Sequence, residues 1–289
     1  MKRPLLALVL VLFIFAGVVC TKPKPAIEPI SKAETAFLFF GDWGTGGKEQ
    51  REVAKGMQSF CANHTCDFAA LLGDNFYPSG VKSVDDPQWK TKFSDIYGPL
   101  GLVFYVALGN HDYQGNTKAQ IDYTKQSKIW RMDAAYFSYT FGGADFFVVD
   151  TNEKKFDAAQ HKWLREGLAN SKANWKIVYG HHPIFSYGAH GDTPYLVTDL
   201  LPVVENQADF YLCGHDHDLQ VLKGSDRLNT IVSGAAAQLR PVKRGSRSQF
   251  AASALGFSHL QLKADSAVLN MLGKDGKPLF TQEYQHRAR

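Results

Sequence analysis

Residues 36–44, AFLFFGDWG, place a run of five apolar residues directly before a glycine and an aspartate. A short apolar run that ends in a glycine turn is typical of a strand buried on both faces. The same arrangement, an apolar run followed by polar residues, recurs along the chain. It predicts strands at residues 36–40, 68–72, 102–108, 146–149, 176–179 and 209–213.

Two segments between these strands have the spacing of amphipathic helices. The apolar positions are Val53, Met57 and Phe60 in the first segment, and Ala159, Trp163, Leu164 and Leu168 in the second. Strands that alternate with helices indicate an α/β fold in which helices cover both faces of a sheet. Residues 229–284 are richer in strand patterns, with an Asp275-Gly276 turn before the last one, and we expect them to form the second sheet of a sandwich.

The composition is that of a globular protein with one substantial core. The 289 residues are 45% hydrophobic and 21% charged, and neither a repeat nor a low-complexity tract interrupts them. The formal net charge of +4 includes Lys2 and Arg3, so the rest of the chain has too little positive charge to favour nucleic acid or lipid. We expect a monomer whose partner is a small molecule rather than a nucleic acid.

The amino terminus has the pattern of a secretory signal peptide. Two cations precede an apolar run at residues 5–19, which is short for a helix that crosses a bilayer core of about 30 Å. We predict a signal peptide at residues 1–20, an extended linker rich in Lys and Pro at residues 21–35, and one folded domain at residues 36–289. Export to the envelope, periplasm or medium follows. An uncleaved signal anchor, or lipid attachment at Cys20, is the alternative that would hold the protein at a membrane.

The remaining cysteines have different expected roles. Cys61 and Cys66 could close a small loop, CANHTC, because an oxidising compartment permits a disulfide. Cys213 lies inside an apolar run, where a buried free thiol is expected. A CxxC pair is absent from the sequence, so the cysteines do not indicate a zinc site.

Every polar motif lies just past the end of a predicted strand, and ligands gather at the carboxyl ends of strands in open α/β sheets. The motifs are GDWG at 41–44, GDNFY at 73–77, GNHD at 109–112, GHHP at 180–183 and GHDH at 214–217. A Gly-Asp turn by itself is common, but five polar motifs in this position predict one shared site.

The residue types in these motifs form a metal-ligand set. Carboxylates, imidazoles, an amide oxygen and a phenol suit Fe, Mn or Zn rather than metals that prefer thiolates. His215 and His217 are two residues apart, so they would point to the same side of an extended chain. The histidines outside the motifs, which we expect to be structural or exposed, are His64, His161, His259 and His286.

The ordered motifs resemble those of the purple acid phosphatases, within the calcineurin-like metallophosphoesterases. The resemblance is strongest to the small, single-domain, tartrate-resistant type and extends from about Ala36 to the carboxyl terminus. It includes the stretches AQIDYTKQSKIW, FYLCGHDHDLQ and IVSGA. The resemblance implies a four-layer α/β/β/α sandwich and makes residues 36–289 a metallophosphoesterase catalytic domain.

The resemblance also implies a binuclear centre that hydrolyses phosphate monoesters by attack of a metal-bound hydroxide. One iron(III) would be bound by Asp42, Asp74, Tyr77 and His217. A divalent metal (Fe, Zn or Mn) would be bound by Asp74, Asn110, His181 and His215. Tyr77 distinguishes this family, because its phenolate favours trivalent iron and the wider superfamily usually lacks it.

Two further histidines have implied catalytic roles. In related enzymes, a histidine in GNHD and one in the loop after GHxP contact phosphate and help protonate the leaving alkoxide. These match His111 and His190, with Asn110 beside the substrate. We expect Asp112 to orient His111. His182 matches no family position and is expected to be a loop residue within reach of substrate.

One departure from the family affects regulation, and two rival functions stay open. Mammalian relatives have a longer loop that represses the site until it is cut, whereas only residues 151–157 precede the next predicted helix here. Proteolytic activation is therefore not expected. The rivals are a phosphodiesterase or nucleotide hydrolase of the same superfamily, and a secreted iron- or phosphate-binding protein without turnover.

Overall fold

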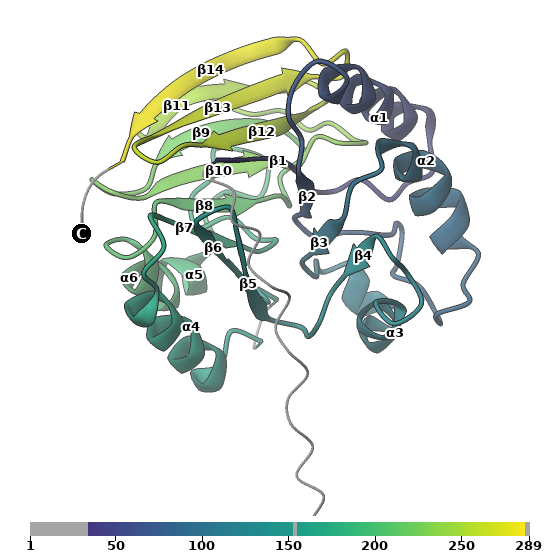
Figure 1. The fold of residues 1–289 in the computed structure, drawn as a ribbon, viewed down its shortest axis with the longest axis horizontal. Helices are drawn as coiled ribbons and strands as arrows, with labels where there is room; N and C mark the ends of the chain where they lie inside the picture. The colour runs from purple at the N-terminus through teal and green to yellow at the C-terminus, as the bar shows by residue number, and fades with distance from the viewer. Residues whose placement is uncertain (1–33, 153–154, 287–289) are drawn as a thin grey trace, which may run out of the picture.

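A computed structural model describes residues 34–152 and 155–286 of the chain. Two seven-stranded mixed sheets face each other, and helices cover their outer faces (Figure 1). Sheet A has the order β14-β13-β12-β1-β2-β3-β4, and sheet B has the order β11-β9-β10-β8-β7-β6-β5. This arrangement confirms the predicted α/β sandwich.

The strands of sheet A are β1 (Thr35–Phe40), β2 (Phe68–Leu71), β3 (Phe104–Val106), β4 (Trp130–Arg131), β12 (Gly256–Leu262), β13 (Ser266–Gly273) and β14 (Pro278–Gln285). Those of sheet B are β5 (Phe137–Phe141), β6 (Ala144–Val148), β7 (Trp175–Tyr179), β8 (Phe210–Cys213), β9 (Leu219–Lys223), β10 (Asn229–Ser233) and β11 (Ser248–Ala252). The helices are α1 (Lys48–Cys61), η1 (Trp89–Ser94), α2 (Asp95–Tyr97), η2 (Gly98–Leu100), η3 (Asp112–Gln114), α3 (Thr117–Tyr123), α4 (Ala158–Asn170), α5 (Pro194–Asp199) and α6 (Leu201–Val204).

The central strands are buried on both faces, as their continuous apolar runs predict. In β6, Phe146 and Val148 belong to the large core between the sheets, whereas Phe147 packs in a second core with α4 and α6. Side chains alternate between the faces of a strand, so one apolar run can supply both cores. Phe37 joins the sheets: its ring lies 5.0 Å from that of Phe68 in sheet A and 5.2 Å from that of Phe146 in sheet B.

The prediction for the carboxyl-terminal strands was wrong in one respect. Residues 229–284 do not form a sheet of their own, because β10 and β11 join sheet B while β12–β14 join sheet A. β1 pairs parallel with β2 on one side, and its other edge is satisfied by antiparallel pairing with β12. An open edge in a buried strand leaves backbone groups unpaired, so a distant segment fills it. The predicted turn at Asp275-Gly276 does separate β13 from β14.

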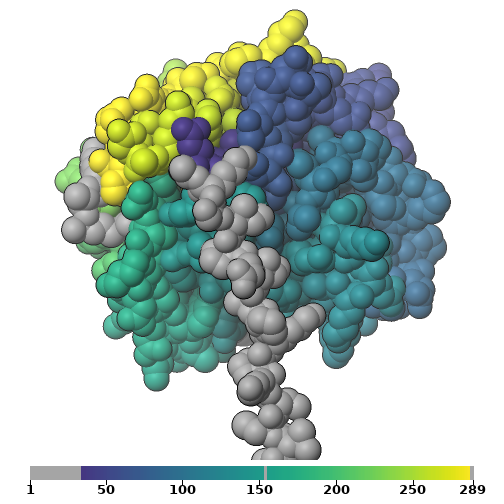
Figure 2. All heavy atoms as spheres, viewed as in Figure 1, coloured from purple at the N-terminus to yellow at the C-terminus, as the bar shows by residue number. Residues whose placement is uncertain are grey.

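The carboxyl-terminal strands meet α1 at the surface. The yellow carboxyl-terminal strands adjoin the blue region of α1 in Figures 1 and 2. Lys274, between β13 and β14, contacts Glu52 of α1 through an ion pair of 2.7 Å. The first described strand begins at Thr35, one residue before the expected boundary, and α4 begins at Ala158 after the short loop.

The predicted signal peptide and all but the end of the predicted linker lie outside the described residues. Between residues 34 and 152 and between 155 and 286, we find no helix of the length and apolar character that crossing a membrane requires. Cys61 and Cys66 form a disulfide, and Cys213 is a buried free thiol. Both outcomes agree with the expectations for the three cysteines.

Phe37→Ala should destabilise the domain strongly, because the buried ring contacts both sheets. We expect a loss of about 3–5 kcal/mol of unfolding free energy, measured by urea denaturation. Leu279→Ala, at a side chain that is 44% exposed, is the control and should change stability by less than about 0.5 kcal/mol. Equal effects of the two substitutions would contradict this description of the core.

Candidate metal centre

The five polar motifs meet at the carboxyl ends of β1, β2, β3, β7 and β8. β1, β2 and β3 are parallel to one another in sheet A, as are β7 and β8 in sheet B, so the loops that follow them emerge at one edge. All seven predicted ligands converge there: Asp42, Asp74, Tyr77, Asn110, His181, His215 and His217. Asp42 and Asp74 are buried, being 0% and 2% exposed.

A first cluster surrounds the Tyr77 hydroxyl. Its oxygen lies 3.0 Å from Asp42 Oδ1, 2.9 Å from Asp74 Oδ2 and 3.3 Å from His217 Nε2. His217 Nε2 is also 3.4 Å from Asp42 Oδ1. These are the four side chains that the family resemblance implies as ligands of the trivalent metal.

A second cluster surrounds His181 Nε2. This nitrogen lies 3.1 Å from Asn110 Oδ1, 3.2 Å from His215 Nδ1 and 3.5 Å from Asp74 Oδ2. The same Asp74 oxygen therefore belongs to both clusters. It occupies the position expected of a bridging ligand.

In the second cluster, hydrogen-bond acceptors outnumber the donors that face them. His181 Nδ1 donates to the Leu72 carbonyl at 2.9 Å, so Nε2 of the neutral ring is left as an acceptor. It faces the amide oxygen of Asn110 and the carboxylate of Asp74, which are acceptors too. A backbone carbonyl that orients a histidine in this way is the usual support of a metal-ligating imidazole. The donor set fits a cation.

Electrostatics at the centre agree with this fit. Burial, and then the charges of Asp42 and Asp74, raise the pKa of the Tyr77 phenol far above its ordinary value. Burial, and then His181, lower the pKa of His215, which keeps its imidazole neutral. No lysine or arginine in the described chain forms an ion pair with either carboxylate, and the side chains within ion-pair distance of them are histidines.

The backbone is strained at three of the candidate ligands. Asp42, Asp74 and His215 have φ values of 60°, 51° and 69°, in the left-handed region that side chains other than glycine rarely adopt. They are the non-glycine residues with positive φ in the described ranges. Such strain persists only where the surrounding structure enforces it, and it concentrates at functional sites. His215 is therefore not extended, and His215 and His217 serve different clusters rather than one side of a strand.

The two candidate acids lie at the edge of the clusters. His111 donates from Nδ1 to the Pro78 carbonyl at 2.5 Å, and its backbone N–H donates to Asp74 Oδ1 at 2.8 Å. The exposed ring of His190 lies 4.2 Å from the ring of His215. Asn110 has its amide oxygen in the second cluster. All three face the same edge.

The expected role of Asp112 was wrong. Its buried carboxylate accepts hydrogen bonds from the Asn75 and Gly109 backbone N–H groups and from the Gln120 side chain. His111 is oriented by Pro78 instead. Because Asp112 follows directly after His111 in the GNHD motif, proximity in the chain suggested a contact that the turn of η3 prevents.

Two residues of the motifs do more than the sequence suggested. Asp216 accepts from the His190 backbone N–H at 2.9 Å and from the Ser186 hydroxyl, so it holds the loop that presents His190. His182 lies with His181 and His215 in a group of imidazoles whose nitrogens come within 4.8 Å of one another. Strand alternation in GHDH could not have indicated Asp216, because the chain is not extended at His215.

The sequence profile of the calcineurin-like phosphoesterases matches residues 35–219. Tartrate-resistant acid phosphatase type 5 of Sus scrofa is 31% identical over 93% of this chain and 91% of its own. Purple acid phosphatase 7 of Arabidopsis thaliana is 36% identical over 74% of each chain. The chain belongs to the purple acid phosphatases. This family has a binuclear metal centre, and the two clusters provide candidate ligands for it.

Solved structures give the same fold. The structure described as GAP50, the anchor in the inner membrane complex of Plasmodium, has a TM-score of 0.80 and 27% identity, over 89% of this chain and 90% of that one. PhoD has a TM-score of 0.62 at 12% identity, over 89% of this chain and 71% of that one, and supports the fold alone.

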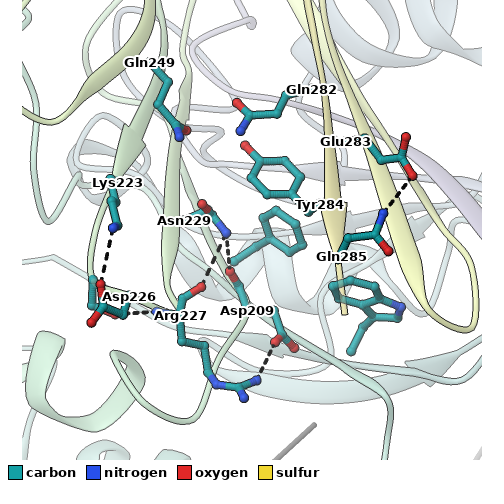
Figure 3. Close-up of a pocket in the computed structure, with 13 residues that line it drawn as sticks. Asp209, Lys223, Asp226, Arg227, Asn229, Gln249, Gln282, Glu283, Tyr284 and Gln285 are labelled. Carbon is teal, nitrogen blue, oxygen red and sulfur yellow. Dashed lines mark hydrogen bonds and ion pairs between the residues drawn. The ribbon is translucent and has the colours of Figure 1, made fainter. Parts of the chain in front are cut away.

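A pocket of about 360 Å³ lies elsewhere in this purple acid phosphatase (Figure 3). Trp175, Phe210 and Asn229 line it, and they lie at the amino ends of β7, β8 and β10. The candidate ligands follow the opposite ends of β7 and β8, and none of them lines this pocket. The pocket is therefore separate from the metal centre.

Gly109→Ala should disrupt the centre, because a Cβ there would lie 2.2 Å from the backbone nitrogen and Oδ1 of Asp74. We expect loss of bound metal, measured by elemental analysis, and destabilisation by about 2 kcal/mol or more. Gly98→Ala is the matched control, since nothing lies within 4 Å of its Cβ position and its φ is −53°. Full metal content in Gly109→Ala would refute the close approach.

Proposed function

We propose that this chain is an acid phosphatase that hydrolyses phosphate monoesters at a binuclear centre containing Fe(III) and a divalent Fe, Zn or Mn. The observation that carries the proposal is the shared Asp74 Oδ2, 2.9 Å from Tyr77 Oη and 3.5 Å from His181 Nε2. A carboxylate oxygen common to two ligand clusters suits two adjacent cations. The matched family profile and the acid phosphatase relatives support the same reaction.

Tyr77 supports the assignment of the first cluster to trivalent iron. Its pKa is raised by burial and by two carboxylates, so the phenol would stay protonated beside a weakly charged ion. A highly charged cation between the same three oxygens would reverse this balance, since it stabilises the phenolate directly. When bound, the metal pair supplies Lewis-acid polarisation of the phosphoryl group and activation of water.

The protein's own residues would bind the ester and move the proton. The Nδ1 of His111 is committed to the Pro78 carbonyl, so its Nε2 faces the centre, 3.9 Å from Asp74 Oδ2. With a second proton on the ring, this nitrogen would donate a hydrogen bond to a phosphoryl oxygen. His190 is more exposed and lies beside His215 at the edge of the centre, and we assign to it the proton that the departing alkoxide takes up.

The disulfide between Cys61 and Cys66 supports export, which we propose as the destination of the chain. Disulfides form and persist in oxidising compartments and are rare where thiols are kept reduced. Attachment to a membrane through Cys20 or an uncleaved signal remains a proposal about residues outside the described structure.

A second candidate function is that of an anchor without turnover, which the structural likeness to the Plasmodium anchor protein favours. The convergence of all seven candidate ligands argues for catalysis. Hydrolysis of 4-nitrophenyl phosphate by the metal-loaded protein decides between them, and a higher rate on a bis-ester would favour a phosphodiesterase.

Tyr77→Phe should abolish a visible absorption band, because the colour of a tyrosinate–Fe(III) pair arises from charge transfer between that phenolate and the iron. The oxidised, iron-loaded parent protein should be coloured and the variant colourless, as measured by absorption spectroscopy with metal analysis. Tyr123→Phe, whose ring stacks on Trp89, is the control and should keep the band. A colourless parent protein with bound iron would rule out phenolate ligation.

His190→Ala should slow the hydrolysis of esters with poor leaving groups more than that of esters with good ones. We expect kcat to fall at least about 100-fold for an alkyl phosphate and less than about tenfold for 4-nitrophenyl phosphate, because an aryl oxide needs little protonation. His64→Ala, at a ring stacked on Phe60, should change neither rate. Equal losses on both esters would remove the acid role of His190.

A further inference from the structure

A basic segment borders the metal centre. Residues 240–247, RPVKRGSR, contain four cations and no carboxylate. They belong to the connection between β10 and β11, which leaves sheet B at the end of β10 that follows Ser233. β10 is parallel to β8, whose carboxyl end carries His215 and His217. The segment therefore starts at the same edge as the candidate ligands.

Arg240 is the cation of this segment that faces the centre. Its Nη1 donates to His190 Nε2, and its backbone N–H donates to the carbonyl of His217 at 2.9 Å. The Ser253 hydroxyl donates to the Arg240 carbonyl at 2.8 Å. The backbone of Arg240 is thus held on both sides, and its half-buried side chain lies beside a candidate catalytic histidine.

The other arginines of the segment are engaged elsewhere. Arg244 donates to the Gln249 carbonyl at 2.8 Å. Arg247 lies 3.9 Å over the Phe185 ring and donates to the carbonyls of Lys223 and Gly224. These contacts stabilise the segment itself. Arg240 differs because its side-chain partner belongs to the reaction site.

The guanidinium of Arg240 lacks an anionic partner within the described residues. The nearby carboxylate of Asp216 is already used by the His190 N–H and the Ser186 hydroxyl. A guanidinium has five N–H donors and binds carboxylate or phosphate groups through paired hydrogen bonds, which are stronger than a bond to a neutral imidazole. An anion that entered beside His190 would be the better acceptor.

We propose that Arg240 forms a subsite for a second anionic group, a carboxylate or phosphoryl, on a substrate whose scissile phosphate lies at the metal centre. The inference rests on the proposed function and extends it to substrate choice. It assigns the enzyme a preference for phosphate esters that carry a further negative charge close to the ester. Esters without that second charge would bind less tightly, because they leave Arg240 unpaired.

Non-hydrolysable ligands test the subsite without turnover. Ethylphosphonate has one anionic group, whereas phosphonoacetate adds a carboxylate and methylenebisphosphonate adds a phosphoryl group. Calorimetric titration of the metal-loaded protein gives the ratio of Kd for ethylphosphonate to Kd for each ligand with two anionic groups. In Arg240→Gln we expect this ratio to fall about tenfold, equivalent to about 1.4 kcal/mol. Arg240→Lys should restore part of it.

Arg244→Gln is the matched control, because it removes a cation of the same segment that contacts only the Gln249 carbonyl. Its ratio should equal that of the parent. In Arg240→Gln, a fall in the Kd ratio for phosphonoacetate or in that for methylenebisphosphonate supports the subsite and identifies the anion it prefers. An unchanged ratio in both arms, including equal weakening of all three ligands, overturns it and leaves Arg240 as support for His190.

A separate measurement tests the underlying reaction. The parent protein should hydrolyse both glycerol 1-phosphate and 3-phosphoglycerate. Its kcat/KM should be higher for 3-phosphoglycerate, which carries the additional carboxylate. Absence of turnover on both esters would contradict the proposed function while the calorimetric ratio still reports on Arg240. Turnover together with Kd ratios that are the same in the parent and in Arg240→Gln would contradict the subsite alone.

Discussion

The candidate metal centre depends on a pair of buried carboxylates with which no lysine or arginine in the described structure forms an ion pair. Asp42 and Asp74 follow adjacent parallel strands, β1 and β2, and are 0% and 2% exposed. Burial of a charge is costly unless an opposite charge or a metal accompanies it. Histidines, an amide oxygen and a phenol surround the pair instead of lysine or arginine, so a cation is the natural complement. The strained backbone at both aspartates has the same explanation, since it aims each carboxylate inward.

A second group of polar residues makes the centre rigid. Asp112 ties the GDNFY turn to the GNHD turn through backbone N–H groups of Asn75 and Gly109, and Asp216 ties GHDH to the loop of His190. Asp112 and Asp216 support the centre without contacting a metal, because each fixes the position of a turn that carries candidate ligands. A buried network of this kind is effective only when its members are satisfied. The division between inner ligands and outer supports explains why adjacent residues in one motif have different roles.

The site is asymmetric around this rigid centre. The ligands and Asp112 are held by buried hydrogen bonds, whereas His190 and Arg240 lie at an accessible edge. The candidate ligands thus lie in the buried part, whereas the proposed acid and the proposed substrate contact lie at the edge. Residues that contact substrate away from the reacting atoms can change without disturbing the metals, which is how one fold supports several substrate preferences.

The sequence by itself determined the fold class, the six central strands, the candidate ligands and their gathering at one edge. These are local properties: an apolar run and the turn after it report their own burial, and ligand chemistry follows from residue type. Only the tertiary structure decided that β12–β14 complete sheet A, that Asp112 supports Asn75 rather than His111, and that Arg240 lies against His190. Each of these depends on which distant segments fill an unpaired edge or face a particular side chain. Periodicity along the chain carries no information about such pairings, because they are chosen by the packing of the whole molecule.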